Sequence, residues 1–432
     1  MVKDHHGHQL SGASAAAGEL YQKALTAQHC YAGDGFTAVQ AAIEDSPDFV
    51  MAHALKAYMT LLGSNSATAM LGVEAFHAAK DLAADTREQG HLAAIGALLQ
   101  GEIRTAARVL EDVALAHPHD VLALQVGQTM DFLLGDARMK RDRIGRVRPL
   151  WSRDMPDWHA ILGLHAFGLE ECGQYERAEE AGREAVSLQP RNNWAQHAVA
   201  HVLVMQGRHA DGVRWMLHEN TAWQPEATLG VHNWWHTALF HLGLGEVDEV
   251  LKLYDGPVYG ETTTFAFDMA DAAALLWRLQ LMGVDVGDRW TTLADNFASE
   301  GHGKSAFVDT HAMMAYVGAG REPEQAGLLE TQRQALEGAG DNAMFVRDVG
   351  LATVGAIHAF GQGDDGRAID LLRAVRNRAG RFGGSHAQRD VLDLTLIAAA
   401  RRAGETALER ALLAEREEAM PLAREAIRAL AA

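Results

Sequence analysis

Apolar residues recur along most of this chain at positions i, i+3, i+4 and i+7, in long stretches that are rich in alanine and leucine. This spacing places the apolar side chains on one face of an α-helix, and the alternation with period two that is typical of strands is almost absent. Short turns separate the stretches, and the nine prolines fall at breaks such as Pro47, Pro118 and Pro190. The pattern therefore predicts an all-α protein.

Glycines at the predicted turns give this pattern a period. They stand 34 to 43 residues apart, at Gly63, Gly101, Gly135, Gly173, Gly207, Gly245, Gly283, Gly320, Gly363 and Gly404. A period in the mid-thirties, built from helix–turn–helix units, is typical of the tetratricopeptide class. Because a single hairpin cannot bury its apolar face alone, consecutive hairpins must stack. We therefore predict a tetratricopeptide-like superhelix, or α-solenoid, of roughly ten helical hairpins.

The stacking predicts one solenoid over residues 1–432 with no domain boundary. Its repeats are best defined in residues 140–255 and more divergent in residues 256–432. The basic stretch 140–148 and the glycine-rich stretch 380–385 are expected to be loops within the array.

Composition narrows the choice of partners. Hydrophobic residues make up 48% of the chain, which is enough for a large core, and the formal net charge is −19. Because phosphate groups are bound by clustered lysine and arginine, this charge argues against nucleic acid and anionic membranes as partners. No run approaches the roughly 18 or more apolar residues that span a bilayer.

The two cysteines, Cys30 and Cys172, lack the spacing of a zinc site or a disulfide framework, which fits a reducing compartment. The first residues contain no apolar signal segment. We therefore expect a cytoplasmic protein. The histidines near its start, His5, His6 and His8, are expected to belong to a solvated tail.

Histidines are concentrated in the middle of the chain. Two pairs are spaced i,i+4, so that each projects from one face of a helix. The first pair is His197 with His201. The second is His232 with His236, and Trp234 and Trp235 lie between these two in the sequence. Histidine gains and loses protons near neutral pH and is a common metal ligand. The cluster therefore indicates a site.

The repeat register extends this cluster into a longer pattern. Counting ten residues back from each turn glycine reaches positions that would share one interior stripe of the superhelix, namely His53, His91, Gln125, Gly163, His197, Trp235, Ala273 and Thr310. His201 and His232 fall on the same helix faces. We therefore expect these histidines to line the concave surface.

Three interpretations of the histidine pairs remain open at this point. In the first, the imidazoles are half-buried structural groups that bond backbone or carboxylate partners. In the second, the two i,i+4 pairs clamp zinc, although no glutamate follows His197 or His232 as it does in an HExxH helix. In the third, the histidines line a shared pocket. Metal ligation ranks behind the shared pocket, so we expect neither a metal nor a cofactor.

In the shared-pocket interpretation, histidines meet carboxylates from later repeats and act as acids and bases. The predicted catalytic residues are His197, His201, His232, His236, Asp309, His311 and His386. A guanidinium can hold a ligand carboxylate and a tryptophan can supply an apolar wall. The predicted ligand-binding residues are Trp234, Trp235, Arg389, Asp390 and His165. Asp268 and Asp271 are expected to be one solvated carboxylate and one cap or pocket residue.

Two phrases of the sequence are specific, His232-Asn-Trp-Trp-His236 and Gly383-Gly-Ser-His386-Ala-Gln-Arg389-Asp390. With Asp309-Thr-His311 and several weaker phrases between about residues 140 and 400, they resemble the tetratricopeptide repeat protein 38 family. One departure is Val204, where a glutamate would be expected before Met205-Gln-Gly207. The resemblance implies an all-helical repeat fold and a cytosolic protein, and it implies no particular reaction.

We therefore expect an interior pocket, lined by histidine, tryptophan and aspartate, that binds a small organic molecule. It would act on that molecule by metal-independent acid/base chemistry of a hydrolase or lyase type. The alternative is a non-catalytic scaffold that binds a peptide or a partner protein in its concave groove, the usual role of such repeats. The expected partner is accordingly a small molecule, or else a protein or a second copy of this chain.

Overall fold

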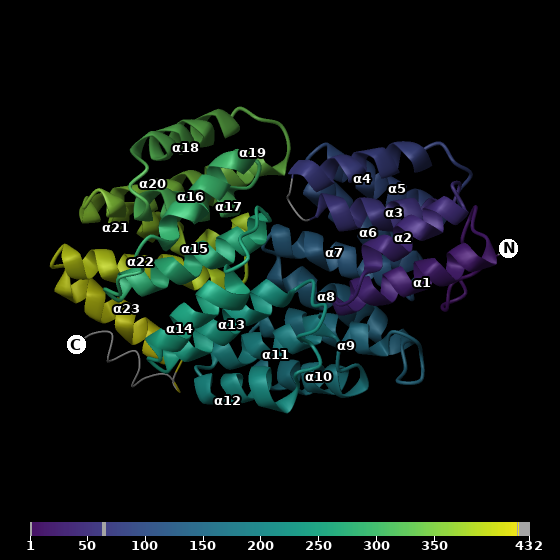
Figure 1. Cartoon of the computed structure of the whole chain (residues 1–432), viewed down its shortest axis with the longest axis horizontal. Helices are drawn as coiled ribbons and strands as arrows, with labels where there is room; N and C mark the ends of the chain where they lie inside the picture. Colours follow the sequence, from purple (N-terminus) through teal and green to yellow (C-terminus); the bar gives the residue numbers. More distant parts are fainter. Residues whose placement is uncertain (1, 63–65, 421, 423–432) are drawn as a thin grey trace. The chain divides into compact units, whose positions relative to one another are not determined.

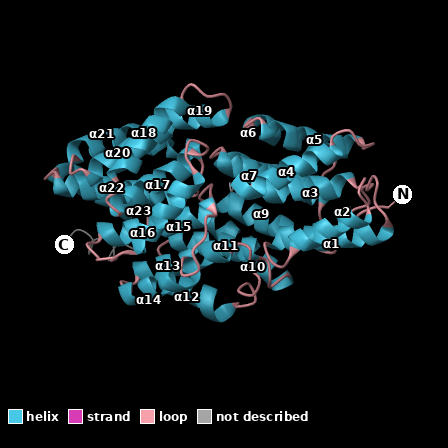
Figure 2. Ribbon diagram, turned by 45° about the horizontal axis from the view of Figure 1, so that its top comes forward, coloured by secondary structure: helices cyan, strands magenta, loops and turns pink. Residues whose placement is uncertain are grey.

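The computed structural model of the protein describes residues 2–62, 66–420 and 422. Figure 2 shows helices joined by loops, and the described residues contain two isolated backbone bridges, Lys3 with Gln9 and Ala32 with Ala227, but no strand. The all-α prediction is confirmed. Gly63, one of the predicted turn glycines, lies outside the described residues.

The chain folds into two compact units. Unit 1 comprises Met1–Val199 and Asn220–Gly230, and unit 2 comprises Ala200–Glu219 and Val231–Ala432. The single array expected over residues 1–432 stays a prediction.

The helices of unit 1 follow one another through short turns (Figure 1). They are α1 (Ala15–Cys30), α2 (Gly35–Asp45), α3 (Val50–Leu61), α4 (Ser66–Ala79), α5 (Thr86–Leu99), α6 (Ile103–Ala116), α7 (Val121–Leu133), α8 (Ala137–Val147), the 3₁₀ segment η1 (Arg148–Leu150), α9 (Trp158–Glu170), α10 (Tyr175–Leu188) and the first part of α11 (Asn193–Met205). Neighbouring helices pack as antiparallel hairpins, for example α3 with α4, α5 with α6, and α9 with α10.

Unit 2 contains the end of α11 and the later helices. They are α12 (His209–Arg214), η2 (Trp215–Glu219), α13 (Gly230–Gly243), α14 (Val247–Leu253), η3 (Tyr254–Val258), α15 (Ala266–Leu281), α16 (Arg289–Glu300), α17 (Ala306–Gly318), α18 (Glu322–Ala335), α19 (Asp341–Phe345), η4 (Val346–Gly350), α20 (Leu351–Gly361), α21 (Asp365–Val375), η5 (Arg376–Phe382), α22 (His386–Arg402) and α23 (Thr406–Ala419). Hairpin packing recurs here, for example between α20 and α21 and between α22 and α23.

The turn glycines adopt the left-handed conformation that the sequence pattern requires. Their φ angles lie between 66° and 77° at Gly101, Gly135, Gly173, Gly207, Gly245, Gly283, Gly320, Gly363 and Gly404. At the end of α9 the reason is visible, because the Gln174 N–H donates to the Leu169 carbonyl at 2.9 Å across the left-handed Gly173. This cap closes the helix and reverses the chain, and only glycine enters it without steric cost. The predicted fold class, an all-α repeat of tetratricopeptide-like hairpins, is confirmed.

The expected loop at residues 140–148 is wrong. Most of this stretch is helix α8, and two of its basic side chains, Lys140 and Arg143, are buried, whereas Arg146 and Arg148 are exposed. Arg143 contacts Asp131 at 2.7 and 3.0 Å, with both side chains almost fully buried. Lys140 is likewise buried against Glu171 at 2.7 Å. Buried charges of this kind are kept only when they are paired.

The solvated tail expected at the start of the chain is also wrong. The Nε2 atom of His6 lies 3.0 Å from a carboxylate oxygen of Asp157, and the His6 side chain is only 7% exposed. Its ring packs against Trp151 with the two ring centroids 5.1 Å apart. Next to it, His8 contacts Asp4 at 3.0 Å. His6 and His8 are therefore part of the packed structure of unit 1, whereas His5 is exposed.

Helix α15 is the buried centre of unit 2. Its side chains are buried continuously from Met269 to Leu279, and it packs against α16, α17 and α22 (Figure 1). In an open linear array each repeat contacts only its neighbours. Two hairpins, α17–α18 and α20–α21, lie between the hairpins of α15 and α22, yet the Trp277 Nε1–H donates to the Thr395 hydroxyl at 2.9 Å. The helices of unit 2 thus curl back on themselves and surround α15.

One helical run, Asp341–Gly361, has the length and composition of a membrane span, with 21 residues and a mean hydropathy of 1.3. However, 61% of the most apolar 18-residue window of this run is buried inside the protein, and α20 packs against α17 and α21. The run also includes Arg347 and Asp348. Burial against neighbouring helices accounts for its apolar character, as in a core helix.

Candidate functional site

Three of the predicted histidines meet in unit 2. His232 and His236 stand one turn apart on α13, and His201 approaches them from the end of α11. The His236 ring lies 4.4 Å from that of His201 and 4.8 Å from that of His232, between centroids. One ring nitrogen of each lies within 4.8 Å of one from each other member. The i,i+4 spacing therefore produces the shared face that the sequence predicts.

Asp271 of α15 holds this cluster from one side. Its Oδ2 atom lies 2.6 Å from Nδ1 of His232, and its Oδ1 atom accepts a hydrogen bond from the Gln388 amide at 3.2 Å. Because an ionised carboxylate only accepts hydrogen bonds, this contact places the His232 proton on Nδ1. Asp271 thus contacts the histidine cluster, and Asp268, the other member of the expected pair, is half-buried instead of solvated.

Titratable groups around the cluster are strongly affected by burial. Burial lowers the pKa of His236 well below its ordinary value, and repulsion from His201 and His232 adds to this effect. Burial also raises the pKa of Asp268 to about 7, helped by repulsion from Asp271 and opposed by attraction to His232. His236 is therefore neutral at pH 7, whereas Asp268 is close to half protonated.

Trp235 and Arg278 form a layer beside the cluster. The fully buried Trp235 ring stacks on His232, with the ring centroids 5.3 Å apart and their planes inclined by 15°. The guanidinium of Arg278 lies 5.5 Å from the Trp235 ring centroid. It donates hydrogen bonds to the carbonyls of Ala274, at 3.0 Å, and Ala387, at 2.7 Å. Two of its five N–H donors are thereby used.

Within the described part of the chain, Arg278 forms no ion pair, although its side chain is only 4% exposed. Burial lowers the pKa of Arg278 to about 10, and repulsion from Arg416 adds to this, whereas attraction to Asp390 opposes it. A buried cation without an anionic partner is costly for the folded state.

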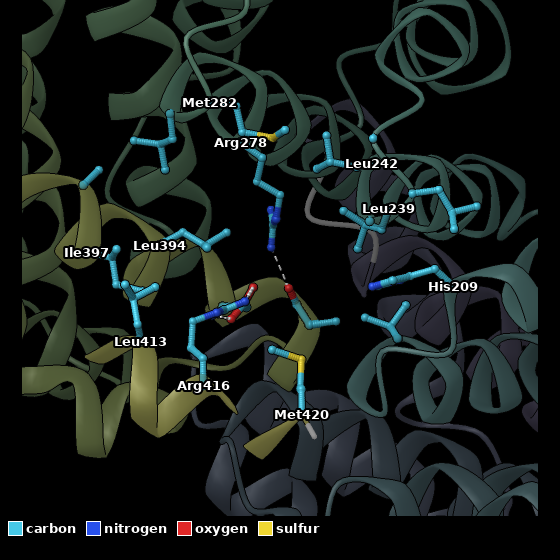
Figure 3. A pocket seen from close by; sticks show the side chains of 18 of the residues that line it. His209, Leu239, Leu242, Arg278, Met282, Leu394, Ile397, Leu413, Arg416 and Met420 are labelled. Carbon is cyan, nitrogen blue, oxygen red and sulfur yellow. Dashed lines mark hydrogen bonds and ion pairs between the residues drawn. The ribbon is translucent and has the colours of Figure 1, made fainter. Parts of the chain in front are cut away.

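Arg278 lines a cavity of about 460 Å³ in unit 2, and Figure 3 shows it entering from one side and Arg416 from another. Most of the wall is apolar, from residues such as Leu239, Leu242, Met282, Leu394, Ile397 and Leu413. The polar lining includes Asp390, which forms an ion pair with Arg416. None of His201, His232 and His236 lines this cavity. The cavity and the histidine cluster are thus two distinct places in unit 2: Arg278 lines the cavity, whereas Trp235 stacks on His232 of the cluster.

The two predicted residues of α17 serve different surroundings. Asp309 accepts hydrogen bonds from the Gln332 amide at 2.7 Å and from the Gly303 N–H at 3.0 Å. His311 bonds the Phe307 carbonyl through Nδ1 at 2.9 Å, and burial lowers its pKa to about 4. Residues two apart on a helix do not face each other, so Asp309 and His311 do not form a pair.

The other predicted residues are spread over both units. His197 and His165 are buried in unit 1, where His197 packs against Phe167 and Trp194 with centroid distances of 5.3 and 4.9 Å. His386 and Trp234 are half-buried residues of unit 2. Arg389 donates to the carbonyls of Gly384 and Gly383, so it holds the loop before α22. Their assignment to one catalytic set stays a prediction.

The first interpretation, a structural role, describes two histidines of the predicted stripe. His91 bonds Asp120 through Nε2 at 3.0 Å and Tyr58 through Nδ1 at 3.2 Å. His53 bonds the Pro47 carbonyl at 2.8 Å. These contacts lie within unit 1, where His91 links α5 to α3 and to the N-cap of α7, and His53 holds the loop before α3.

Sequence reasoning missed Arg278, Gln388 and Arg416. Arg278 offers one signal, since it stands seven residues after Asp271 in a largely apolar helix, which places both on one face. Gln388 and Arg416 offer no such signal in the sequence, because their roles depend on which helices pack together in the fold.

A scan of the chain against models of known protein families finds no match. Among solved structures it is similar to a Rap protein complexed with competence and sporulation factor (TM-score 0.43, 10% identity, covering 87% of this chain and 99% of that one). It is also similar to a human IFIT1 dimer with m7Gppp-AAAA (TM-score 0.43, 17% identity, covering 98% of this chain and 95% of that one). A third similar structure is yeast Tom70 (TM-score 0.33, 14% identity, covering 96% of this chain and 94% of that one). These likenesses are distant and assign no function, and the resemblance to the tetratricopeptide repeat protein 38 family stays a prediction.

Proposed function

We propose that unit 2 binds a small molecule with an apolar body and a single carboxylate group in the cavity beside Arg278. The observation that carries the proposal is a buried guanidinium that has no ion-pair partner among the described residues and lines an apolar cavity. A ligand carboxylate would accept hydrogen bonds from the Arg278 N–H groups that do not bond the two carbonyls, and it would neutralise the positive charge.

The charges of the cavity favour a monoanion. Arg416 is neutralised by Asp390, and Arg401 by Glu409 at 2.6 Å. Burial lowers the pKa of His209, which is therefore neutral at pH 7. Arg278 is the remaining positive charge among these lining residues. One net charge matches a carboxylate better than a phosphate dianion, which would need further cationic donors.

The size and the wall of the cavity favour an aliphatic or aromatic body. Its volume of about 460 Å³ falls within the roughly 300–1,000 Å³ typical of small-molecule sites. Leucine, isoleucine and methionine dominate its lining. Because the clustered histidines do not line it, this proposal concerns binding and includes no acid/base step.

Isothermal titration with decanoate and its uncharged analogue decanol tests the proposal. Both have the same apolar chain, so the difference in affinity isolates the contribution of the carboxylate. We expect decanoate to bind one equivalent per chain at least about tenfold more tightly than decanol, since a hydrogen bond to a charged group contributes about 1.5–3 kcal/mol. Equal affinities would refute the carboxylate site.

The second candidate function is the scaffold that binds a peptide or a partner protein, which agrees with the helical-repeat fold. It makes a different prediction for the same titration. A scaffold without a cavity ligand would bind neither decanoate nor decanol stoichiometrically. The cytoplasmic location remains part of either proposal.

A further inference from the structure

We propose that His201, His232 and His236 bind one divalent transition-metal ion, with Zn²⁺ as the best match. None of these three residues lines the cavity, so the inference is independent of the cavity ligand.

The geometry of the three rings suits a shared ion. Each offers a ring nitrogen within 4.8 Å of one from each of the others. Zinc–nitrogen bonds of about 2.0–2.1 Å in a tetrahedral arrangement would bring these atoms to roughly 3.3 Å from one another. Side-chain rotations that move each nitrogen by an ångström or so are therefore sufficient. The i,i+4 pair on α13 supplies two ligands from one rigid helix, which limits the ordering that binding requires.

A carboxylate already orients one ligand. Asp271 accepts the Nδ1 proton of His232 at 2.6 Å, so Nε2 carries the lone pair that a metal requires. Gln388 in turn donates to the other oxygen of Asp271 at 3.2 Å. This succession of amide, carboxylate and imidazole is the arrangement that commonly supports metal-bound histidines and raises their basicity.

The contacts of His91 show what a structural histidine looks like in the same protein. Its two nitrogens bond a carboxylate and a tyrosine hydroxyl, and no second imidazole is involved. In the cluster, by contrast, three imidazoles lie against one another with neighbouring centroids 4.4 and 4.8 Å apart. Several imidazoles that converge in this way repel one another when protonated, whereas their neutral forms can share a cation.

The chemistry of the ligand set selects the class of metal. Imidazole nitrogen suits Zn²⁺, Co²⁺, Ni²⁺ and Cu²⁺, whereas Mg²⁺ and Ca²⁺ prefer oxygen ligands. Three imidazoles supply three of the four positions of a tetrahedral Zn²⁺ ion.

Metal titration of the full chain, purified without a histidine tag and stripped with a chelator, tests this inference. We expect one equivalent of Co²⁺ to bind with the absorption bands of a tetrahedral complex and to be displaced by Zn²⁺. Asp271→Asn keeps all three ligands and should weaken Zn²⁺ binding about 10–100-fold. His241→Ala is the matched control, because His241 is a histidine of the same helix that contacts Glu246 instead, and it should leave the affinity unchanged.

Three outcomes would overturn the site. The first is the absence of stoichiometric Co²⁺ binding to the wild-type chain, a result that depends on no variant. The second is unchanged binding in His201→Ala/His236→Ala, with far-UV circular dichroism to verify that the helices persist. The third is loss of the bound equivalent in His6→Ala/His8→Ala, which would place the metal at the N-terminal histidines of unit 1.

Discussion

Replacing Arg278 by methionine is expected to weaken carboxylate binding while the protein stays folded. Methionine keeps the length and apolar stem of the side chain but removes the guanidinium from the cavity wall. Decanoate would lose at least one charge-assisted hydrogen bond, which contributes about 1.5–3 kcal/mol. Its dissociation constant should therefore rise roughly 10- to 150-fold, since 1.4 kcal/mol corresponds to a factor of ten. Binding of decanol should change little.

The effect of the same change on the free energy of unfolding can be worked out from the contacts of Arg278. Burial lowers its pKa from 12.5 to about 10, so the folded state disfavours the charged form by about 3 kcal/mol. Methionine removes this cost. It also removes two hydrogen bonds from the charged guanidinium to carbonyls, at about 1.5–3 kcal/mol each, and a cation–π contact with Trp235 of about 1 kcal/mol. The lost contacts outweigh the relieved cost, so the variant should be less stable than the wild type by about 1–4 kcal/mol.

Urea unfolding and isothermal titration of the same preparations measure both quantities. Arg289→Met is a matched control, because Arg289 pairs with Asp255 near the surface of unit 2 and does not line the cavity. It should leave the affinity for decanoate unchanged. If Arg278→Met binds decanoate as tightly as the wild type does, the guanidinium is not the anion receptor. A loss of stability well above about 4 kcal/mol would show that Arg278 is a structural residue instead.

Three further predictions concern stability. Burial lowers the pKa of His311 to about 4 in the folded state, so the unfolded chain takes up a proton first as the pH falls, and stability should be lost from about pH 6.5 down to pH 4. Between pH 7 and pH 5 this linkage lowers the free energy of unfolding by about 2 kcal/mol. The His311→Gln variant, measured by urea unfolding, should lose about 2 kcal/mol less than the wild type over the same pH range. Arg143→Met would leave the buried carboxylate of Asp131 without its ion-pair partner and should cost about 3–5 kcal/mol in urea unfolding, part of which Arg143→Met/Asp131→Leu should restore. Gly168→Ala would place its Cβ 2.6 Å from the backbone of α8 and should cost about 1–3 kcal/mol, whereas at Gly145 an added Cβ meets no atom within 4 Å, so Gly145→Ala should be neutral or stabilising. Equal thermal shifts for these two alanine variants would contradict the close approach of α8 and α9.

The helical period predicted which histidines would share a face. His232 and His236 come together as their i,i+4 spacing requires, because the side-chain directions of a helix depend on local geometry alone. The same local rule separates Asp309 from His311, although their closeness in sequence suggested a common pocket. Residues that are close in sequence therefore need not share one site in the folded protein.

The partners of these histidines could not be read from the sequence. Asp271 stands 39 residues after His232, and the carbonyl that Arg278 bonds belongs to a residue 109 positions later. Such contacts depend on how far the helices of unit 2 curl, and many small packing contributions decide that curvature. The prediction of a loop at residues 140–148 was wrong for a related reason. Basic residues are usually solvated, and they are buried only where acidic partners contact them in the fold.

The sequence by itself determined the helices, the left-handed glycine turns and the hairpin repeat, because each depends on interactions within a few residues. Only the tertiary structure decided which charges are buried, which of them are neutralised, and where a cavity remains. Those properties arise when α15 is surrounded and water is removed from Arg278, Asp271 and the histidines. Without water, a buried charge that has no partner destabilises the folded state, and a partner from a distant part of the chain stabilises it.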